Sequence, residues 1–182
     1  NEFLAALIEE EGIDWSRVNA YHMDEYVGLG LEDKPAFSRF LTDAIFSKVP
    51  FRSVNLINGK APDAEAEAER YGALLRSQEI DITFMGIGEN GHIAFNDPAV
   101  ADFHDTKTVK VVSLDDVCRM QQVHDGCFPA FDDVPQHAMT VTIPELVSAR
   151  KVFCIVPTDK KAEAVRNALE GPVAETCPAS IL

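Results

Sequence analysis

The spacing of apolar residues along the chain switches repeatedly between the period of a helix and that of a strand. Helical spacing predicts helices over residues 3–8, 35–49, 63–77 and 159–169. Short runs rich in β-branched and aromatic residues predict strands over residues 17–21, 53–57, 80–85, 109–113 and 151–156. Because strands that alternate with helices are typical of a parallel sheet covered by helices, the pattern predicts an α/β protein.

The charge of the chain restricts its partners. Thirty acidic and sixteen basic residues give a formal net charge of −14 among 182 residues. Such a chain repels polyphosphates, so we expect it to bind neither nucleic acid nor an anionic membrane. The length suits one domain, and no apolar run is long enough to span a membrane, which predicts a soluble protein.

Cysteines and histidines are scattered without the spacing of a metal site. The four cysteines are Cys118, Cys127, Cys154 and Cys177, and no two of them form a C-x-x-C pair. We interpret them as small core residues in a reducing, cytoplasmic protein. The five histidines form no H-E-x-x-H or i, i+4 pair, so no metal is expected.

A glycine-rich segment follows the strand predicted over residues 80–85. Gly86, Gly88 and Gly91 expose backbone N–H groups at the carboxyl end of this strand, where ligands of open α/β sheets bind. These glycines satisfy the G-x-G-x-x-G pattern of dinucleotide-binding domains. That pattern requires a helix at the third glycine, whereas Asn96-Asp97-Pro98 breaks the chain here. A dinucleotide site is therefore disfavoured.

The same segment carries several polar side chains that can transfer protons. They are Glu89, Asn90, His92, Asn96 and Asp97. An imidazole next to a carboxylate forms a general acid/base pair, since the carboxylate orients the ring and stabilises its charged form. His92 could instead only hydrogen-bond a turn. The density of polar groups at a strand end favours catalysis.

A second polar cluster follows the strand predicted over residues 17–21. Asp24 and Glu25 are adjacent carboxylates that point in different directions, so only one of them can face a given ligand. Either one is a candidate base. The alternative interpretation is an acid-rich first turn of a helix, which is a common feature.

The chain contains two long motifs, M-D-E-Y-V-G-L from Met23 and F-M-G-I-G-E-N-G-H-I-A-F-N-D-P from Phe84. Together with residues 55–63, 132–143 and 170–180, these motifs resemble the glucosamine-6-phosphate deaminase/isomerase family. The resemblance covers nearly the whole chain. It implies a Rossmann-like three-layer fold with a mostly parallel sheet between helices. It also implies conversion of glucosamine 6-phosphate to fructose 6-phosphate and ammonia, without a metal or redox cofactor.

The resemblance assigns roles to four candidate catalytic residues. Asp24 matches the family's enolisation base, which takes a proton from C2 and delivers it to C1. His92 matches the ring-opening acid/base, and Asn90 falls where members carry Asp or Asn to support that histidine. Asp97 falls where members usually carry Glu, and the missing methylene withdraws its carboxylate by about 1.5 Å unless the backbone compensates.

Four further residues are candidates for substrate binding. Lys161 resembles the family's phosphate-binding lysine, and Arg119 matches the first of two arginines in a family motif. The second arginine is replaced in residues 125–128, so binding of the phosphate or the choice of sugar phosphate is expected to differ. The N–H groups of Gly86 and Gly88 are the backbone candidates.

The family's glycine- and threonine-rich phosphate loop and first strand should precede residue 1, and a last strand should follow Leu182. We therefore expect residues 1–182 to form a single domain truncated at both ends. A polypeptide limited to these residues is expected to be inactive and poorly soluble, because exposed sheet edges lack their neighbours.

Two alternatives remain beside the deaminase. A 6-phosphogluconolactonase resembles this fold and also has a G-x-D-G-H loop, but it lacks the M-D-E-Y-V-G motif and the A-F-N-D-P continuation. A sugar-phosphate sensor would need no base, yet Asp24 and His92 are both present. The expected partner is a small sugar phosphate, and homo-oligomerisation is left open.

Overall fold

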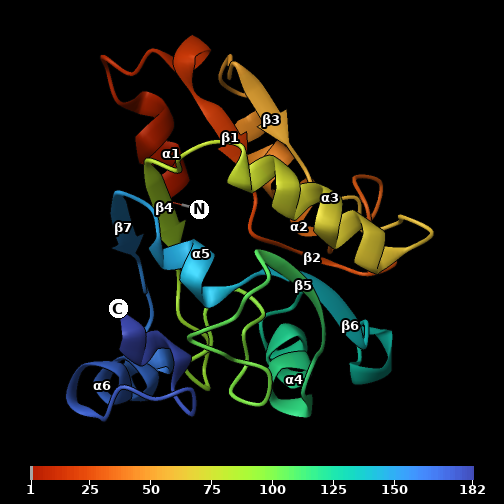
Figure 1. Cartoon of the computed structure of the whole chain (residues 1–182), viewed down its shortest axis with the longest axis vertical. Helices are drawn as coiled ribbons and strands as arrows, with labels where there is room; N and C mark the ends of the chain where they lie inside the picture. The colour runs from red at the N-terminus through yellow and green to blue at the C-terminus, as the bar shows by residue number, and fades with distance from the viewer. Residues whose placement is uncertain (1) are drawn as a thin grey trace.

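Short strands alternate with helices over residues 2–182, the part of the chain that the computed structural model describes (Figure 1). The α-helices are α1 (Glu2–Glu9), α2 (Phe37–Leu41), α3 (Ala64–Arg76), α4 (Asp116–His124), α5 (Ile143–Val147) and α6 (Ala162–Glu170). The strands are β1 (Asn19–Tyr21), β2 (Asp24–Tyr26), β3 (Ser53–Asn55), β4 (Ile82–Met85), β5 (Val109–Ser113), β6 (His137–Val141) and β7 (Lys151–Cys154). The π-helical turn η2 (Thr42–Phe46) continues α2, and 3-10 turns form η1 (Trp15–Arg17), η3 (Phe131–Asp133), η4 (Asp159–Lys161) and η5 (Pro178–Ile181).

The strands form two parallel pairs and one antiparallel sheet. β1 pairs with β3 and β4 pairs with β7 in parallel, while β2, β6 and β5 form an antiparallel sheet in that order. The α/β class is confirmed, but the pairing is more mixed than the expected mostly parallel sheet. Only two residues separate β1 from β2, which leaves no room for the long crossover that a parallel neighbour requires. β2 instead pairs with the distant β6.

Capping residues set the ends of two helices where the sequence predicts them. The Asp63 carboxylate accepts the N–H of Ala66 at 3.0 Å and begins α3, and Gly171 follows the last residue of α6. The sequence pattern did not predict α4, α5, β2 or β6. β2 is only three residues long and owes its conformation to distant β6, so its own sequence carries little strand signal.

Two apolar clusters form the core. In the first, Tyr71 and Leu75 of α3 pack with Val109 of β5 and Met139 of β6. The second is aromatic and surrounds the fully buried Tyr26. Its ring centroid lies 5.3 Å from that of Phe37, 5.1 Å from that of Phe95 and 5.4 Å from that of Phe128. Such aromatic contacts stabilise a fixed arrangement, and here they join β2 to the glycine-rich segment.

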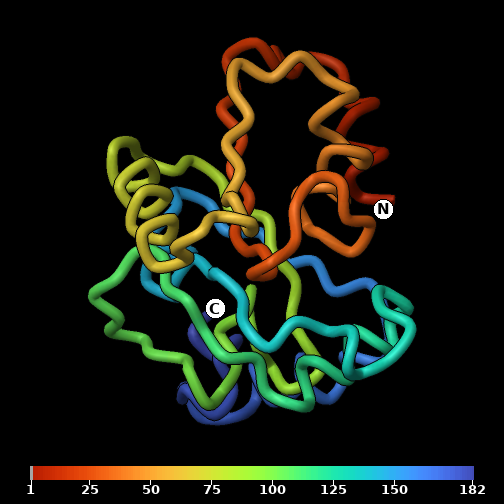
Figure 2. The backbone as a smooth tube through the Cα atoms, turned by 90° about the vertical axis from the view of Figure 1, so that its right-hand side faces the viewer, coloured from red at the N-terminus to blue at the C-terminus, as the bar shows by residue number. Residues whose placement is uncertain are grey.

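Helix α1 and strands β1 and β3 lie toward one end of the molecule, whereas β2 lies in the sheet beside β6 (Figure 1 and Figure 2). The C-terminal segment with α6 lies at the opposite end. None of the helices in residues 2–182 is long and apolar enough to cross a membrane.

Candidate functional site

Asp24 begins β2 and lies opposite Thr140 of β6. The hydroxyl oxygen of Thr140 accepts the backbone N–H of Phe95 at 3.1 Å, and the Asn96 side-chain amide donates to the Val141 carbonyl oxygen at 2.9 Å. These bonds attach the segment after His92 to the strand that pairs with β2. The sheet thereby holds the Asp24 cluster and the glycine-rich segment, which are far apart in sequence, in one region.

The half-buried Asp24 carboxyl has a strongly raised pKa. Burial, and then the nearby negative charge of Glu25, raise the pKa of Asp24 to about 7. Burial also raises the pKa of Glu25, but the nearby His22 ring and hydrogen bonds from Ser38 outweigh it and hold that pKa below its usual value. Glu25 therefore stays ionised beside Asp24. This charge helps to keep the pKa of Asp24 near neutral pH, where a carboxylate can act as a base.

Glu25 has a second, structural role at the start of α2. Its fully buried carboxylate accepts the N–H of Phe37 at 3.1 Å and that of Ser38 at 2.8 Å. A carboxylate is favourable at a helix N-terminus, where backbone N–H groups lack partners within the helix. Of the two adjacent acids, Glu25 is thus occupied by the fold, which leaves Asp24 as the candidate base.

A Glu25→Gln variant is expected to shift the acidic limb of the pH profile of kcat/KM toward lower pH. Removing the neighbouring negative charge lowers the pKa of Asp24, so the base loses its proton at lower pH. The pH profile measures this shift. Glu69→Gln is the matched control, because the Glu69 side chain is 75% exposed and lies on α3. An unchanged limb in a folded Glu25→Gln protein would contradict the electrostatic coupling.

Glycines in the segment after β4 create the space in which His92 lies. A Cβ added to Gly88 would lie 2.1 Å from Cε1 of the His92 ring, and the Gly88 N–H donates to the His92 carbonyl oxygen at 2.9 Å. Gly91 has a positive φ of 83°, a conformation that other residues rarely adopt. At Gly86 an added Cβ would meet the Ile155 carbonyl oxygen at 3.5 Å, an ordinary contact.

His92, Asp97 and Asn90 are brought together by this segment. His92 Nδ1 lies 2.8 Å from Asp97 Oδ1, although the ring is not aligned for a hydrogen bond to it. Asn90 donates from Nδ2 to the same oxygen at 3.0 Å and accepts the His92 N–H on Oδ1 at 3.1 Å. Despite its shorter side chain, Asp97 reaches the imidazole.

Cys118 of α4 lies between the two clusters, which the sequence pattern did not indicate. Burial and the nearby Asp97 carboxylate, followed by weaker effects that include Asp24, raise the pKa of its thiol. Cys118 is fully buried, as expected for a core cysteine. The same expectation is wrong for Cys127 and Cys154, which are exposed. All four cysteines of the chain are free.

Lys161 ends the turn η4 and precedes α6. Its side chain is 12% exposed, and Nζ lies 3.8 Å from Glu89 Oε1. Within the described residues Nζ has no hydrogen-bond partner. A buried ammonium with unused donors next to the glycine-rich segment can bind an anionic group of a substrate.

Arg119 of α4 is 8% exposed and makes its hydrogen bonds to the backbone. One guanidinium nitrogen donates to the carbonyl oxygens of Phe131 and Val134, each at 3.0 Å. The guanidinium carbon also lies 3.9 Å from the centroid of the Phe131 ring. In this structure Arg119 holds residues 131–134 against α4.

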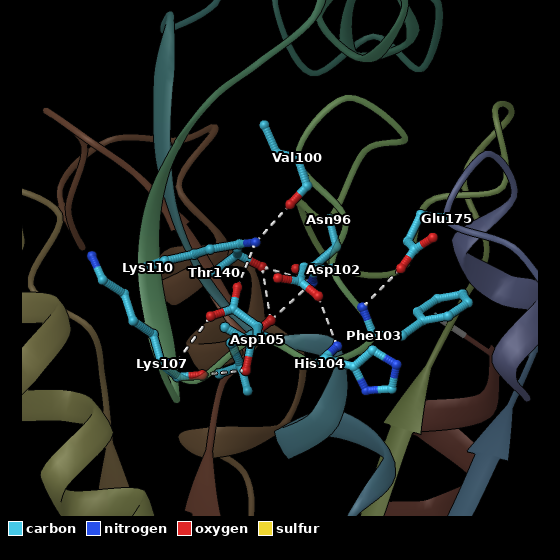
Figure 3. A network of polar contacts seen from close by, with 12 residues as sticks. Asn96, Val100, Asp102, Phe103, His104, Asp105, Lys107, Lys110, Thr140 and Glu175 are labelled. Atoms are coloured by element: carbon cyan, nitrogen blue, oxygen red, sulfur yellow. Dashed lines mark hydrogen bonds and ion pairs between the residues drawn. The ribbon is translucent and has the colours of Figure 1, made fainter.

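A clamp around Lys110 fixes the irregular segment that follows Asp97 (Figure 3). Lys110 Nζ donates to the Val100 carbonyl oxygen at 2.6 Å and to Asp105 Oδ2 at 2.8 Å. The Lys110 and Asp105 side chains are only 13% and 12% exposed. Lys110 lies opposite Thr140 in the sheet, as Asp24 does from the other side. The clamp thus anchors the chain beyond Asp97 to the sheet that carries Asp24.

A Lys110→Met variant is expected to lose about 2 kcal/mol of the free energy of unfolding, because the Asp105 carboxylate keeps its burial and loses its charged partner. Urea unfolding monitored by circular dichroism measures this loss. Lys107→Met is the control: it lies on the same segment, and its ion pair with Glu65 is exposed and contributes little. Equal free energies of unfolding of the two variants would show that the contacts of Lys110 do not stabilise the fold.

The geometry provides what a proton transfer on a small anionic substrate needs. A carboxylate with a pKa near neutrality, a histidine beside a carboxylate, and a buried lysine all border the glycine-rich segment or the strand attached to it. On an α/β fold such a set of groups is typical of an enzyme site that carries out acid/base chemistry on a small anionic molecule.

The chain belongs to the glucosamine-6-phosphate isomerase/6-phosphogluconolactonase family, because the family model of that description matches residues 1–182. The glucosamine-6-phosphate deaminase of Listeria innocua is 38% identical over 181 residues, which cover 100% of this chain and 75% of that protein. The glucosamine-6-phosphate deaminase of an Exiguobacterium species is also 38% identical, over 97% of this chain and 67% of that protein.

Solved structures agree with this membership. A monomeric glucosamine-6-phosphate deaminase superimposes with a TM-score of 0.88 at 33% identity, covering 98% of this chain and 74% of that one. A 6-phosphogluconolactonase from Thermotoga maritima superimposes with a TM-score of 0.75 at 19% identity, covering 97% and 74%. The second likeness extends to the fold alone.

Proposed function

We propose that this protein is an enzyme of amino-sugar catabolism that converts glucosamine 6-phosphate and water to fructose 6-phosphate and ammonia. The proposal is supported by family membership and by relatives at 38% identity that are named glucosamine-6-phosphate deaminases. The reaction is an aldose–ketose isomerisation combined with deamination. It needs a base for a carbon-bound proton and a separate acid/base for the ring oxygen.

In the proposed mechanism His92 acts first and opens the sugar ring. It moves a proton from the C1 hydroxyl to the ring oxygen. Asp97 and Asn90 hold His92 in position for this transfer. Asp24 then takes the proton from C2 and returns it to C1, which gives a 2-imino sugar. Water adds to the imine carbon, and ammonia leaves.

The single observation that carries the proposal is that the half-buried Asp24 has a pKa of about 7. Asp24 lies on β2, apart from the segment that holds His92 and Asp97. Removal of a proton from carbon needs a base, and a carboxylate whose pKa lies near the working pH is well suited to this step. Hydrolysis of a lactone requires only activation of water, and a sensor requires no base at all.

Turnover in heavy water tests this step. Asp24 exchanges its proton with solvent, so deuterium should be found at C1 of the fructose 6-phosphate formed. If every product molecule carries the original C2 hydrogen at C1, the proton on Asp24 does not exchange with solvent. If no product forms, the proposed function is wrong.

We further propose that Lys161 and the N–H groups of Gly86 and Gly88 bind the sugar phosphate. Support comes from the unused donors of the buried Lys161 ammonium, which can offset the overall charge of −14 locally. Arg119 is proposed to contribute through the segment of residues 131–134 that it holds. A cytoplasmic location is proposed as well, since all four cysteines are free.

A further inference from the structure

The proposed acid/base pair, His92 and Asp97, forms a cluster of three different donor groups with the thiol of Cys118. One donor atom each from His92, Asp97 and Cys118 lies within 4.8 Å of the other two. The residues are 8%, 1% and 0% exposed. Nitrogen, carboxylate oxygen and thiolate sulfur are the three donor types with which proteins bind Zn²⁺. The spacing of these residues in sequence gave no sign of such a cluster.

Two atoms of this cluster are buried without a hydrogen bond. Neither His92 Nδ1 nor Asp97 Oδ2 has a hydrogen-bond partner within residues 2–182. Buried polar atoms almost always have partners, because an unpaired one costs free energy. A cation placed among the three side chains would supply a partner to both.

The distances suit a small tetrahedral ion after modest movement. Zn²⁺ lies about 2.0 to 2.3 Å from its ligands, which are then about 3.3 to 3.6 Å apart. His92 Nδ1 and Asp97 Oδ1 are 2.8 Å apart, and the widest separation of donor atoms is at most 4.8 Å. The His92 side chain is 11% exposed, so solvent reaches this edge of the cluster, and a water molecule would complete the coordination of the ion.

We infer that His92, Asp97 and Cys118 form an inhibitory site for Zn²⁺. Binding forms a zinc–thiolate bond and releases the thiol proton of Cys118 to solvent, with no change in oxidation state. The ion inhibits because it occupies lone pairs of His92 and Asp97 that proton transfer requires. The ion is an inhibitor here and not a cofactor. The inhibition, but not the binding, rests on the proposed function.

Cobalt binding tests the site without reference to activity. The full-length, metal-free protein is titrated with Co²⁺. Zn²⁺ is then added as a competitor. We expect one Co²⁺ per chain, with the near-ultraviolet band of a thiolate–cobalt bond and the visible bands of a tetrahedral ion, and loss of both on adding Zn²⁺. A protein that gives no thiolate band would overturn the site.

Cysteine variants identify the ligand. Cys118→Ser and Cys118→Ala should lose the thiolate band and bind Zn²⁺ about 100-fold more weakly. The control is a triple variant in which Cys127, Cys154 and Cys177 are changed to serine. This variant should keep the thiolate band and the wild-type affinity for Zn²⁺. Thermal unfolding shows whether each variant is folded. One folded Cys118 variant is enough for the test. A band that survives in the Cys118 variants, or vanishes in the triple variant, would refute the assignment.

Activity distinguishes the two proposals. Turnover of glucosamine 6-phosphate should fall with Zn²⁺ at the concentration that displaces Co²⁺, and the Cys118 variants should need about 100-fold more Zn²⁺. A cobalt band without any turnover would refute the proposed function and leave the site. Turnover that Zn²⁺ does not inhibit, in a protein that shows the band, would refute the inhibitory role.

Discussion

Turnover of glucosamine 6-phosphate is expected to fall about 10²- to 10⁴-fold when Asp24 is replaced by asparagine, because the amide keeps the shape of the side chain but is not a base. KM should change little. In the wild type, kcat/KM should rise with pH through about 7, the pKa of Asp24, since only the ionised carboxylate accepts the C2 proton. Steady-state assays of product, together with deuterium incorporation at C1, measure both effects.

The stability of the Asp24→Asn variant separates loss of the base from loss of the fold. The folded-state pKa of Asp24 is raised, so ionisation destabilises the wild type progressively as pH rises from about 4 to about 7. Asparagine carries no such charge. The variant should therefore have a higher Tm than the wild type at pH 8 and a similar one at pH 4. Near-normal turnover, or a lower Tm at pH 8, would contradict the role and environment given to Asp24.

A Gly88→Ala variant is expected to lose about 10²-fold or more in kcat. The new methyl group would lie 2.1 to 2.4 Å from three atoms of the His92 ring, so the ring has to move. Such a movement changes the position of His92 Nδ1 relative to Asp97 Oδ1, which lies 2.8 Å away in the wild type. Measured kcat with the cyclic substrate reports the damage to ring opening.

Gly30→Ala is the control for this substitution. The atoms nearest to its Cβ would be Oε2 of Glu32, at 3.1 Å, and Cδ and Cγ of the flexible Lys60 side chain, at 3.6 and 3.7 Å. The hydrogen bond from its N–H to Asp33 is kept. We expect activity close to that of the wild type. If Gly88→Ala and Gly30→Ala are equally active, the close packing of His92 on Gly88 has no part in catalysis.

Local sequence signals predicted the parts of the fold that depend on local interactions. The acidic helix that begins at Asp63 was found because its capping carboxylate and its apolar spacing lie within a few residues of each other. The glycine-rich segment was selected as a candidate site because Gly88, His92 and Asp97 are also close in sequence. Their contacts follow from the short chain between them.

Features that depend on distant parts of the chain were not predicted. β2 is a strand only because it pairs with β6, more than a hundred residues away, and its acids are compatible with other structures. Glu67 belongs to an acidic run that is most simply a solvated face, yet it is 7% exposed and accepts the Asn58 N–H at 2.7 Å. Cys118 has no neighbour in sequence that reveals its position beside Asp97.

Product analysis tests the proposed function most directly. The purified protein, as its gene encodes it, is incubated separately with glucosamine 6-phosphate and with 6-phosphogluconolactone, and ammonia, fructose 6-phosphate and 6-phosphogluconate are measured. We predict equal amounts of ammonia and fructose 6-phosphate from the first substrate, and no acceleration of lactone hydrolysis. Hydrolysis of the lactone without release of ammonia would contradict the assignment of Asp24 as a carbon base and favour a lactonase, and tight binding of glucosamine 6-phosphate without turnover would favour a sensor.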